Sequence, residues 1–163
     1  MRARQSGRLM ALDVGGKRIG VAVADETRTI ASPIAVVARG HDDHAEIARL
    51  IEQWKIEGLV VGLPTGLSGR EGPQAAEVRR YAKGLAATLG SETSIDFWDE
   101  RLTTAIAERA LIANGTRRAR RKEQIDAVAA AVILQDYLDA AHHRRTRGAI
   151  STRPPGQHSD TDR

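Results

Sequence analysis

The chain has 163 residues, of which 41% are apolar and 28% charged, as expected for one globular domain with an ordinary core. The absence of cysteine excludes disulfides and thiolate metal sites. No apolar run approaches the about 18 residues that span a membrane, so we expect a cytoplasmic protein. The net charge of +4 comes from the chain ends, because residues 9–141 alone carry −2.

An antiparallel hairpin is predicted near the start of the chain. Residues 9–14 and 18–25 are apolar runs of strand length, and the glycines of Gly15-Gly16-Lys17 permit a tight turn between them. A pattern of alternating strands and helices follows. The remaining predicted elements are strands over 32–39, 59–63 and 94–98, and helices over 42–58, 73–90, 103–115 and from about 123 to 141.

The ends of the first helix, over 42–58, carry the clearest local signals. Asp43 and Glu46 have the spacing of a capping box, and Gly58 predicts the helix end. Because helical crossovers return the chain in the same direction, the later strands should be parallel to a neighbour. We therefore expect an α/β protein whose mixed sheet is covered on both faces.

The predicted domain fills most of the chain. We expect a flexible basic N-terminus over residues 1–7, one domain over 8–141, and a disordered basic tail over 142–163, because the tail is polar and rich in Arg, Pro, Gly and Ser.

Three acids lie where chemistry is expected. Asp13 ends the first apolar strand, Glu100 follows the fifth strand, and Asp126 opens the otherwise apolar last helix. Strand ends and a helix N-terminus meet at one crevice in α/β proteins, so the three carboxylates are expected to lie together. Each also has a simpler explanation: Asp13 and Glu100 as exposed strand ends, Glu100 as a partner of Arg101, and Asp126 as a first-turn residue complementing the helix dipole.

A cluster of carboxylates needs cations between its members. Oxygen ligands alone favour Mg²⁺ or Mn²⁺ over zinc, and two such ions about 3.5–4 Å apart activate water and stabilise the leaving oxygen of a phosphodiester. The basic run "RRARRK" suits a phosphate backbone beside such a site, although a solvated charged surface remains the alternative. The candidates for phosphate contacts are Lys17, Arg18, Arg101, Arg117, Arg118, Arg120, Arg121 and Lys122.

Four ordered motifs resemble one bacterial protein family. They are "LDVGGKRIGVAVAD", "VVGLPTGLSGREGPQA", "DERLTT" and "IDAVAAAVILQDYL". In order and spacing they resemble the YqgF family, also called RuvX, over residues 8–141. The resemblance implies a ribonuclease-H-like fold, a five-stranded sheet of order 3-2-1-4-5, and a catalytic metal site at Asp13, Glu100 and Asp126.

The same resemblance implies a Mg²⁺- or Mn²⁺-dependent nuclease that processes the 5′ end of pre-16S rRNA during ribosome biogenesis. Pre-rRNA and ribosomal precursor particles are then the expected partners, with monomer and homodimer both open. Alternatives are a resolvase of branched DNA, a non-catalytic rRNA- or ribosome-binding module, and an ATPase, because "DVGGKRIG" also resembles the first phosphate loop of sugar kinases and actin-like proteins. ATPases of that kind need two such domains.

Overall fold

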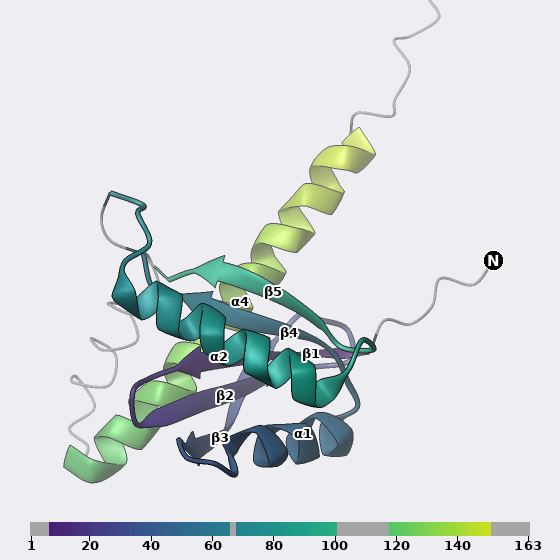
Figure 1. Ribbon diagram of the computed structural model, residues 1–163. Coiled ribbons are helices and arrows are strands. Elements are labelled where there is room, and N and C mark those ends of the chain that lie inside the picture. Colours follow the sequence, from purple (N-terminus) through teal and green to yellow (C-terminus); the bar gives the residue numbers. More distant parts are fainter. Residues whose placement is uncertain (1–6, 66–67, 101–117, 151–163) are drawn as a thin grey trace, which may run out of the picture.

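The computed structural model describes residues 7–65, 68–100 and 118–150, with the side chains of the last helix described for 125–147. Five strands and three helices make up these segments (Figure 1). In chain order they are β1 (Arg8–Val14), β2 (Arg18–Ala24), β3 (Ala31–Ala38), α1 (Asp43–Trp54), β4 (Ile56–Leu63), α2 (Pro73–Leu89), β5 (Ser94–Asp99) and α4 (Arg118–Ile150). The helix predicted over 103–115 lies outside the described residues.

The strands form one mixed sheet of order β3-β2-β1-β4-β5, which confirms the predicted ribonuclease-H-like topology. β1 pairs with β2 and β2 with β3 in antiparallel fashion, as two short connections require. β1 pairs with β4 and β4 with β5 in parallel, because the chain returns through α1 and α2. β1 is therefore the central strand of the sheet, with β2 and β4 on either side of it.

Successive side chains of a strand point to opposite faces of the sheet, so the apolar core is divided into two clusters, one on each face. In β1, Met10 and Leu12 belong to the apolar cluster that packs on α1 and α2, whereas Leu9 and Ala11 belong to the cluster that packs on α4. Figure 1 shows α1 and α2 in front of the sheet and α4 behind it. Asp13, two residues beyond Ala11, therefore faces α4.

The first helix ends earlier than the sequence predicts. α1 stops at Trp54, Lys55 takes a left-handed conformation with φ 53°, and Gly58 lies inside β4 rather than at the helix end. A lysine tolerates this conformation when its N–H caps the helix, as Lys55 does by donating to the carbonyl of Glu52. The predicted capping box is also wrong, because the Asp43 carboxylate accepts instead from the N–H of Gly40, at 3.1 Å.

The last helix is longer at both ends than predicted. It begins at Arg118 and runs to Ile150, so residues 142–150 are helical where the sequence predicts a disordered tail. The charged stretch before Glu123 and the polar stretch after Ala141 lack an apolar face, which is the signal on which the prediction relied. Residues 142–147 are exposed, and α4 projects past the sheet in Figure 1.

No helix among the described residues is long and apolar enough to cross a membrane.

Candidate active site

Asp13 lies at the end of β1, on the face of the sheet that α4 covers. Its neighbour across the antiparallel ladder is Gly20 of β2. A side chain on Gly20 would overlap the backbone carbonyl oxygen of Asp126, so the missing side chain allows α4 to approach the sheet at this point. The close approach of β2 and α4 brings Asp126 to Asp13.

Glu100 reaches the same place from the end of β5. The backbone continues the parallel ladder for one residue, since the N–H of Glu100 donates to the carbonyl of Leu63 at 3.2 Å. Its carboxylate lies over Gly62 of β4, where a Cβ would overlap the Glu100 side chain and that of Ile133. The preceding strand end is held by Thr65, whose hydroxyl donates to Asp99 at 2.6 Å. A second glycine thus makes room for the second acid.

Asp126 lies on α4 and is bound by an arginine. The Nε of Arg18 donates to Oδ2 of Asp126 at 2.9 Å, and the two side chains are 33% and 26% exposed. Since α4 begins at Arg118, Asp126 is about two turns inside the helix. The first-turn, dipole-complementing explanation of Asp126 is therefore wrong, because it assumed a later start of the helix.

Burial and mutual repulsion dominate the electrostatics of the acids. The carboxyl groups of Asp13 and Glu100 hydrogen-bond to each other. Burial, and then the negative charge of Asp13, raises the pKa of Glu100 to about 8. Burial also raises the pKa of Asp13 despite its hydrogen bond with Glu100, and the charge of Asp126 adds to the rise. Glu100 therefore keeps a proton at neutral pH and shares it with Asp13 through their hydrogen bond, because two adjacent buried carboxylates repel each other when both are ionised.

The donor set fits a hard divalent cation better than any other group. It consists of carboxylate oxygens, and the raised pKa values of Asp13 and Glu100 mark a place where positive charge is favoured. Within the described segments, however, no group of three or more acidic or histidine side chains is already arranged to hold a metal ion. Two carboxyl groups are in contact, while the third, that of Asp126, is engaged by Arg18.

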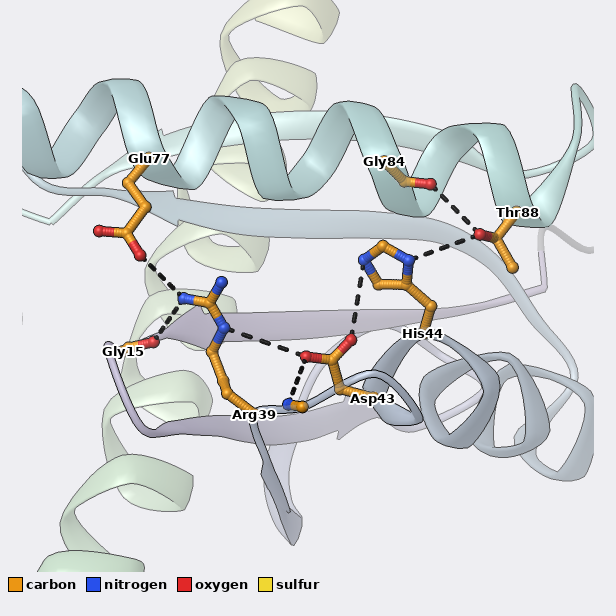
Figure 2. A network of polar contacts seen from close by, with 8 residues as sticks. Gly15, Arg39, Asp43, His44, Glu77, Gly84 and Thr88 are labelled. Carbon is orange, nitrogen blue, oxygen red and sulfur yellow. Dashed lines mark hydrogen bonds and ion pairs between the residues drawn. The ribbon is translucent and has the colours of Figure 1, made fainter.

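The hairpin turn beside Asp13 is clamped by Arg39, which follows β3 (Figure 2). The Nη1 of Arg39 donates to the carbonyl of Gly15 and to Glu77 of α2, each at 3.1 Å. Its backbone N–H donates to the carbonyl of Lys17 at 2.9 Å. The network continues through Asp43, 4.0 Å from the Arg39 guanidinium, into α1. Arg39 thus joins the turn after Asp13 to both helices on the opposite face.

The predicted phosphate-binding residues differ in where they lie and in how much of each the structure describes. Lys17 is exposed in the hairpin turn, and Arg18 is paired with Asp126. Arg101 and Arg117 lie outside the described residues. The other predicted phosphate contacts fall in the first two turns of α4, where only the backbone is described; they are Arg118, Arg120, Arg121 and Lys122.

Sequence reasoning missed Gly20, Gly62 and Arg39. The two glycines had a usable signal, because a glycine inside an apolar strand indicates a close approach of another backbone or side chain. Arg39 had none, since its partners come from the hairpin turn, α1 and α2, which are distant in the sequence.

Comparisons with known proteins give consistent results. A family model described as "RuvX: Holliday junction resolvase" matches residues 7–140. A Roseobacter denitrificans protein named "Putative pre-16S rRNA nuclease" is 47% identical over 133 residues, 80% of this chain and 82% of the relative. A Chloroflexus aggregans protein of the same name is 45% identical over 134 residues, 81% and 93% of the two chains.

Two solved structures share the fold at low sequence identity. One is Thermus thermophilus RuvC in complex with a Holliday junction substrate, with a TM-score of 0.51 and 16% identity over 83% of this chain and 96% of that chain. The other is the Fowlpox virus resolvase in complex with Holliday junction DNA, with a TM-score of 0.50 and 10% identity over 82% and 98% of the two chains. At such identities the likeness concerns the fold alone.

Proposed function

Because the chain belongs to the RuvX family, we propose that it is a metal-dependent nuclease whose substrate is precursor 16S rRNA, processed at the 5′ end. The family assignment supports a hydrolase of nucleic acid, and the name of its relatives supports the RNA substrate.

The observation that carries the proposal is the buried contact between the carboxyl groups of Asp13 and Glu100. Burying two acids side by side is costly, because both carboxyl groups lose part of their hydration. The cost is offset in a protein that uses the acids to bind a cation. Asp126 adds a third carboxylate, whose negative charge already raises the pKa of Asp13.

Asp13, Glu100 and Asp126 would hold Mg²⁺ or Mn²⁺ at the end of the central strands. A pair of such ions supplies an activated water molecule and stabilises the leaving oxygen of a phosphodiester. The protein contributes the position of the ligands: β1 fixes Asp13, the β4–β5 ladder fixes Glu100, and the Gly20 contact fixes Asp126. Asp13 and Glu100 would have to give up the proton that lies between them to act as ligands together.

Basic side chains around the acids would hold the RNA backbone. Lys17 is exposed in the turn that follows Asp13, so it can reach a phosphate beside the acids. The basic start of α4 lies about two turns from Asp126 along the same helix. In the cell the protein would act in the cytoplasm on ribosomal precursor particles, as a monomer or homodimer.

The test is a cleavage assay on matched substrates. Precursor 16S rRNA and a four-way DNA junction are each incubated with the purified protein, with Mn²⁺ and with a chelator. We expect Mn²⁺-dependent cleavage of the RNA, and a loss of at least about a hundredfold in Asp13→Asn and Asp126→Asn. The matched control is Asp139→Asn, on the same helix as Asp126 but hydrogen-bonded to Gln135 instead.

The assay also separates the rival functions. The family description favours the four-way junction as the second candidate substrate, and cleavage of the junction alone would replace the RNA in the proposal. Tight RNA binding without cleavage in Mn²⁺ would identify a non-catalytic binding module. Cleavage that survives Asp13→Asn would rule out the acidic site as the catalytic one.

A further inference from the structure

Arg18 occupies a distinctive position among the arginines that form ion pairs. It lies on the face of β2 that α4 covers, two residues before Gly20, and its Nε bonds Asp126, 108 residues away in the chain, at 2.9 Å. The Arg18 and Asp126 side chains are 33% and 26% exposed, so Asp126 is more shielded from solvent than Glu26, the partner of Arg8, which is 82% exposed. A charge in this partly buried pair therefore has a larger effect on its neighbours than a charge on the open surface.

The acids beside this pair explain why a cation is needed there. Asp13 lies across the β1–β2 ladder from Gly20, and its pKa responds to the charge of Asp126. Without a positive group, Asp126 would face the Asp13–Glu100 pair with an uncompensated charge. Arg18 supplies that positive group, and it does so by engaging one of the three carboxylates of the proposed metal site.

We propose that Arg18 is the internal counter-cation of this site: it holds Asp126 in the metal-free protein and exchanges that carboxylate for a substrate phosphate when Asp126 becomes a ligand. The inference rests on the proposed function. A guanidinium suits both roles, because its planar array of N–H groups matches a carboxylate and a phosphate equally well. Arg18 is thus a positioning residue before the substrate binds and a phosphate contact afterwards.

The first test measures Mn²⁺ binding by titration calorimetry, without substrate. We expect Arg18→Gln to bind Mn²⁺ more tightly than the wild type, on the order of tenfold, because a positive charge that repels the ion and occupies its ligand has been removed. Arg18→Lys keeps the charge and should stay within about twofold of the wild type. Arg8→Gln is the matched control, because it removes an arginine ion pair at the opposite end of the same sheet and should leave Mn²⁺ binding unchanged.

The second test measures single-turnover cleavage of precursor rRNA at saturating Mn²⁺. Arg18→Gln should cleave at least about tenfold more slowly despite binding the ion more tightly, because the guanidinium that binds the phosphate is absent. This opposition between metal affinity and rate is not expected of an arginine that only stabilises the fold. Thermal melting in chelator should show all three variants folded, with Arg18→Gln melting lower than Arg8→Gln.

Two results would overturn the inference. Unchanged or weaker Mn²⁺ binding by Arg18→Gln would show that Arg18 does not compete for Asp126, and wild-type cleavage at saturating Mn²⁺ would show that it does not contact the phosphate. Either result, obtained with a wild type that binds Mn²⁺ and cleaves RNA, leaves the proposed function intact. A wild type that binds no Mn²⁺ would instead refute the proposed function.

Discussion

At the scale of single residues, the acidic site depends on glycines as much as on acids. Gly62 leaves space for the carboxylate of Glu100, and Gly20 leaves space for the backbone of Asp126. Larger side chains at these two positions would separate the carboxyl groups that now lie together. The shared proton between Asp13 and Glu100 is a direct consequence of this closeness, and it makes the stability of the metal-free protein depend on pH.

Glu100 should destabilise the metal-free protein as pH rises. Its pKa is about 8 in the folded protein and has an ordinary value of 4.5. Between these values the folded state keeps a proton that the unfolded state has lost, so stability falls as pH rises through the interval. Glu100→Gln removes this loss, so in chelator it should be more stable than the wild type at about pH 9, by on the order of 1–3 kcal/mol, and similar at about pH 4.5. Urea unfolding at both pH values measures the difference.

A control of opposite sign is available in Glu71. Its hydrogen bond from Arg79 lowers the pKa of Glu71, so any stability it contributes is present above its ordinary value of 4.5 and is lost as pH falls. Glu71→Gln should therefore affect the acidic end of the profile and leave the alkaline end unchanged. A Glu100→Gln profile parallel to that of the wild type would refute the shared proton.

At the scale of elements, the decisive contact is between β2 and α4. The two segments touch backbone to backbone at Gly20 and Asp126, and the Arg18–Asp126 ion pair lies next to this contact. Further along α4, the side chains of Ala130, Ile133, Leu134 and Leu138 build the core on that face of the sheet. One helix therefore provides both the third acid and much of the apolar packing on that face of the sheet.

Gly20→Ala should disturb the protein much more than its small volume suggests. The added Cβ would overlap the carbonyl oxygen of Asp126, so β2 and α4 must separate, at a cost of about 1–3 kcal/mol or more. We expect a lower melting temperature and a smaller stabilisation by Mn²⁺, because Asp126 moves away from the other acids. The control is Gly16→Ala, in the hairpin turn, where an added Cβ meets nothing within 4 Å. Equal melting temperatures for the two variants would contradict the close contact.

At the scale of the whole molecule, the two faces of the sheet differ in what they carry: one has most of the apolar core, and the other has the acids. The α1–α2 face carries the larger apolar cluster and the Arg39 network, and Arg39 holds the hairpin turn through the carbonyl of Gly15. The α4 face carries the acids and Arg18. The start of α4 adds positive charge through Arg118, Arg120, Arg121 and Lys122. Residues 9–141, which include this start, nevertheless carry a net charge of −2.

Reversing the charge of Arg117, Arg118, Arg120 and Arg121 together should weaken RNA binding and flatten its dependence on salt. Each phosphate contact releases counterions, so the slope of affinity against salt falls by roughly one unit for each arginine that no longer binds a phosphate. Filter binding or fluorescence anisotropy between about 50 and 200 mM salt measures the slope. Reversal of Arg144, Arg145 and Arg147, at the exposed far end of α4, is the control on the same helix. Identical slopes for the two variants would make the first cluster a solvated surface.

The resemblance in four motifs implies the order of the strands, and the positions of the three acids at strand ends and near a helix start predict that they lie close together. The sequence does not predict the ends of α4, since Arg118 to Lys122 and His142 to Arg147 have no apolar side to reveal a helix. Nor does it predict the Arg18–Asp126 pair, because its patterns indicate a phosphate contact and a metal ligand rather than two partners. Interactions between residues more than a hundred positions apart depend on packing that no local pattern encodes.

The order in which the chain is synthesised gives the β2–α4 contact a consequence of its own. Asp13 leaves the ribosome early, but Asp126 and the apolar side chains of α4 emerge only when the domain is almost complete, and the sheet cannot cover its second face before then. A nascent or truncated chain thus lacks the third carboxylate and much of the core that holds the first two. Under the proposed function, the nuclease is unable to cut RNA until α4 has been made and has packed on the sheet.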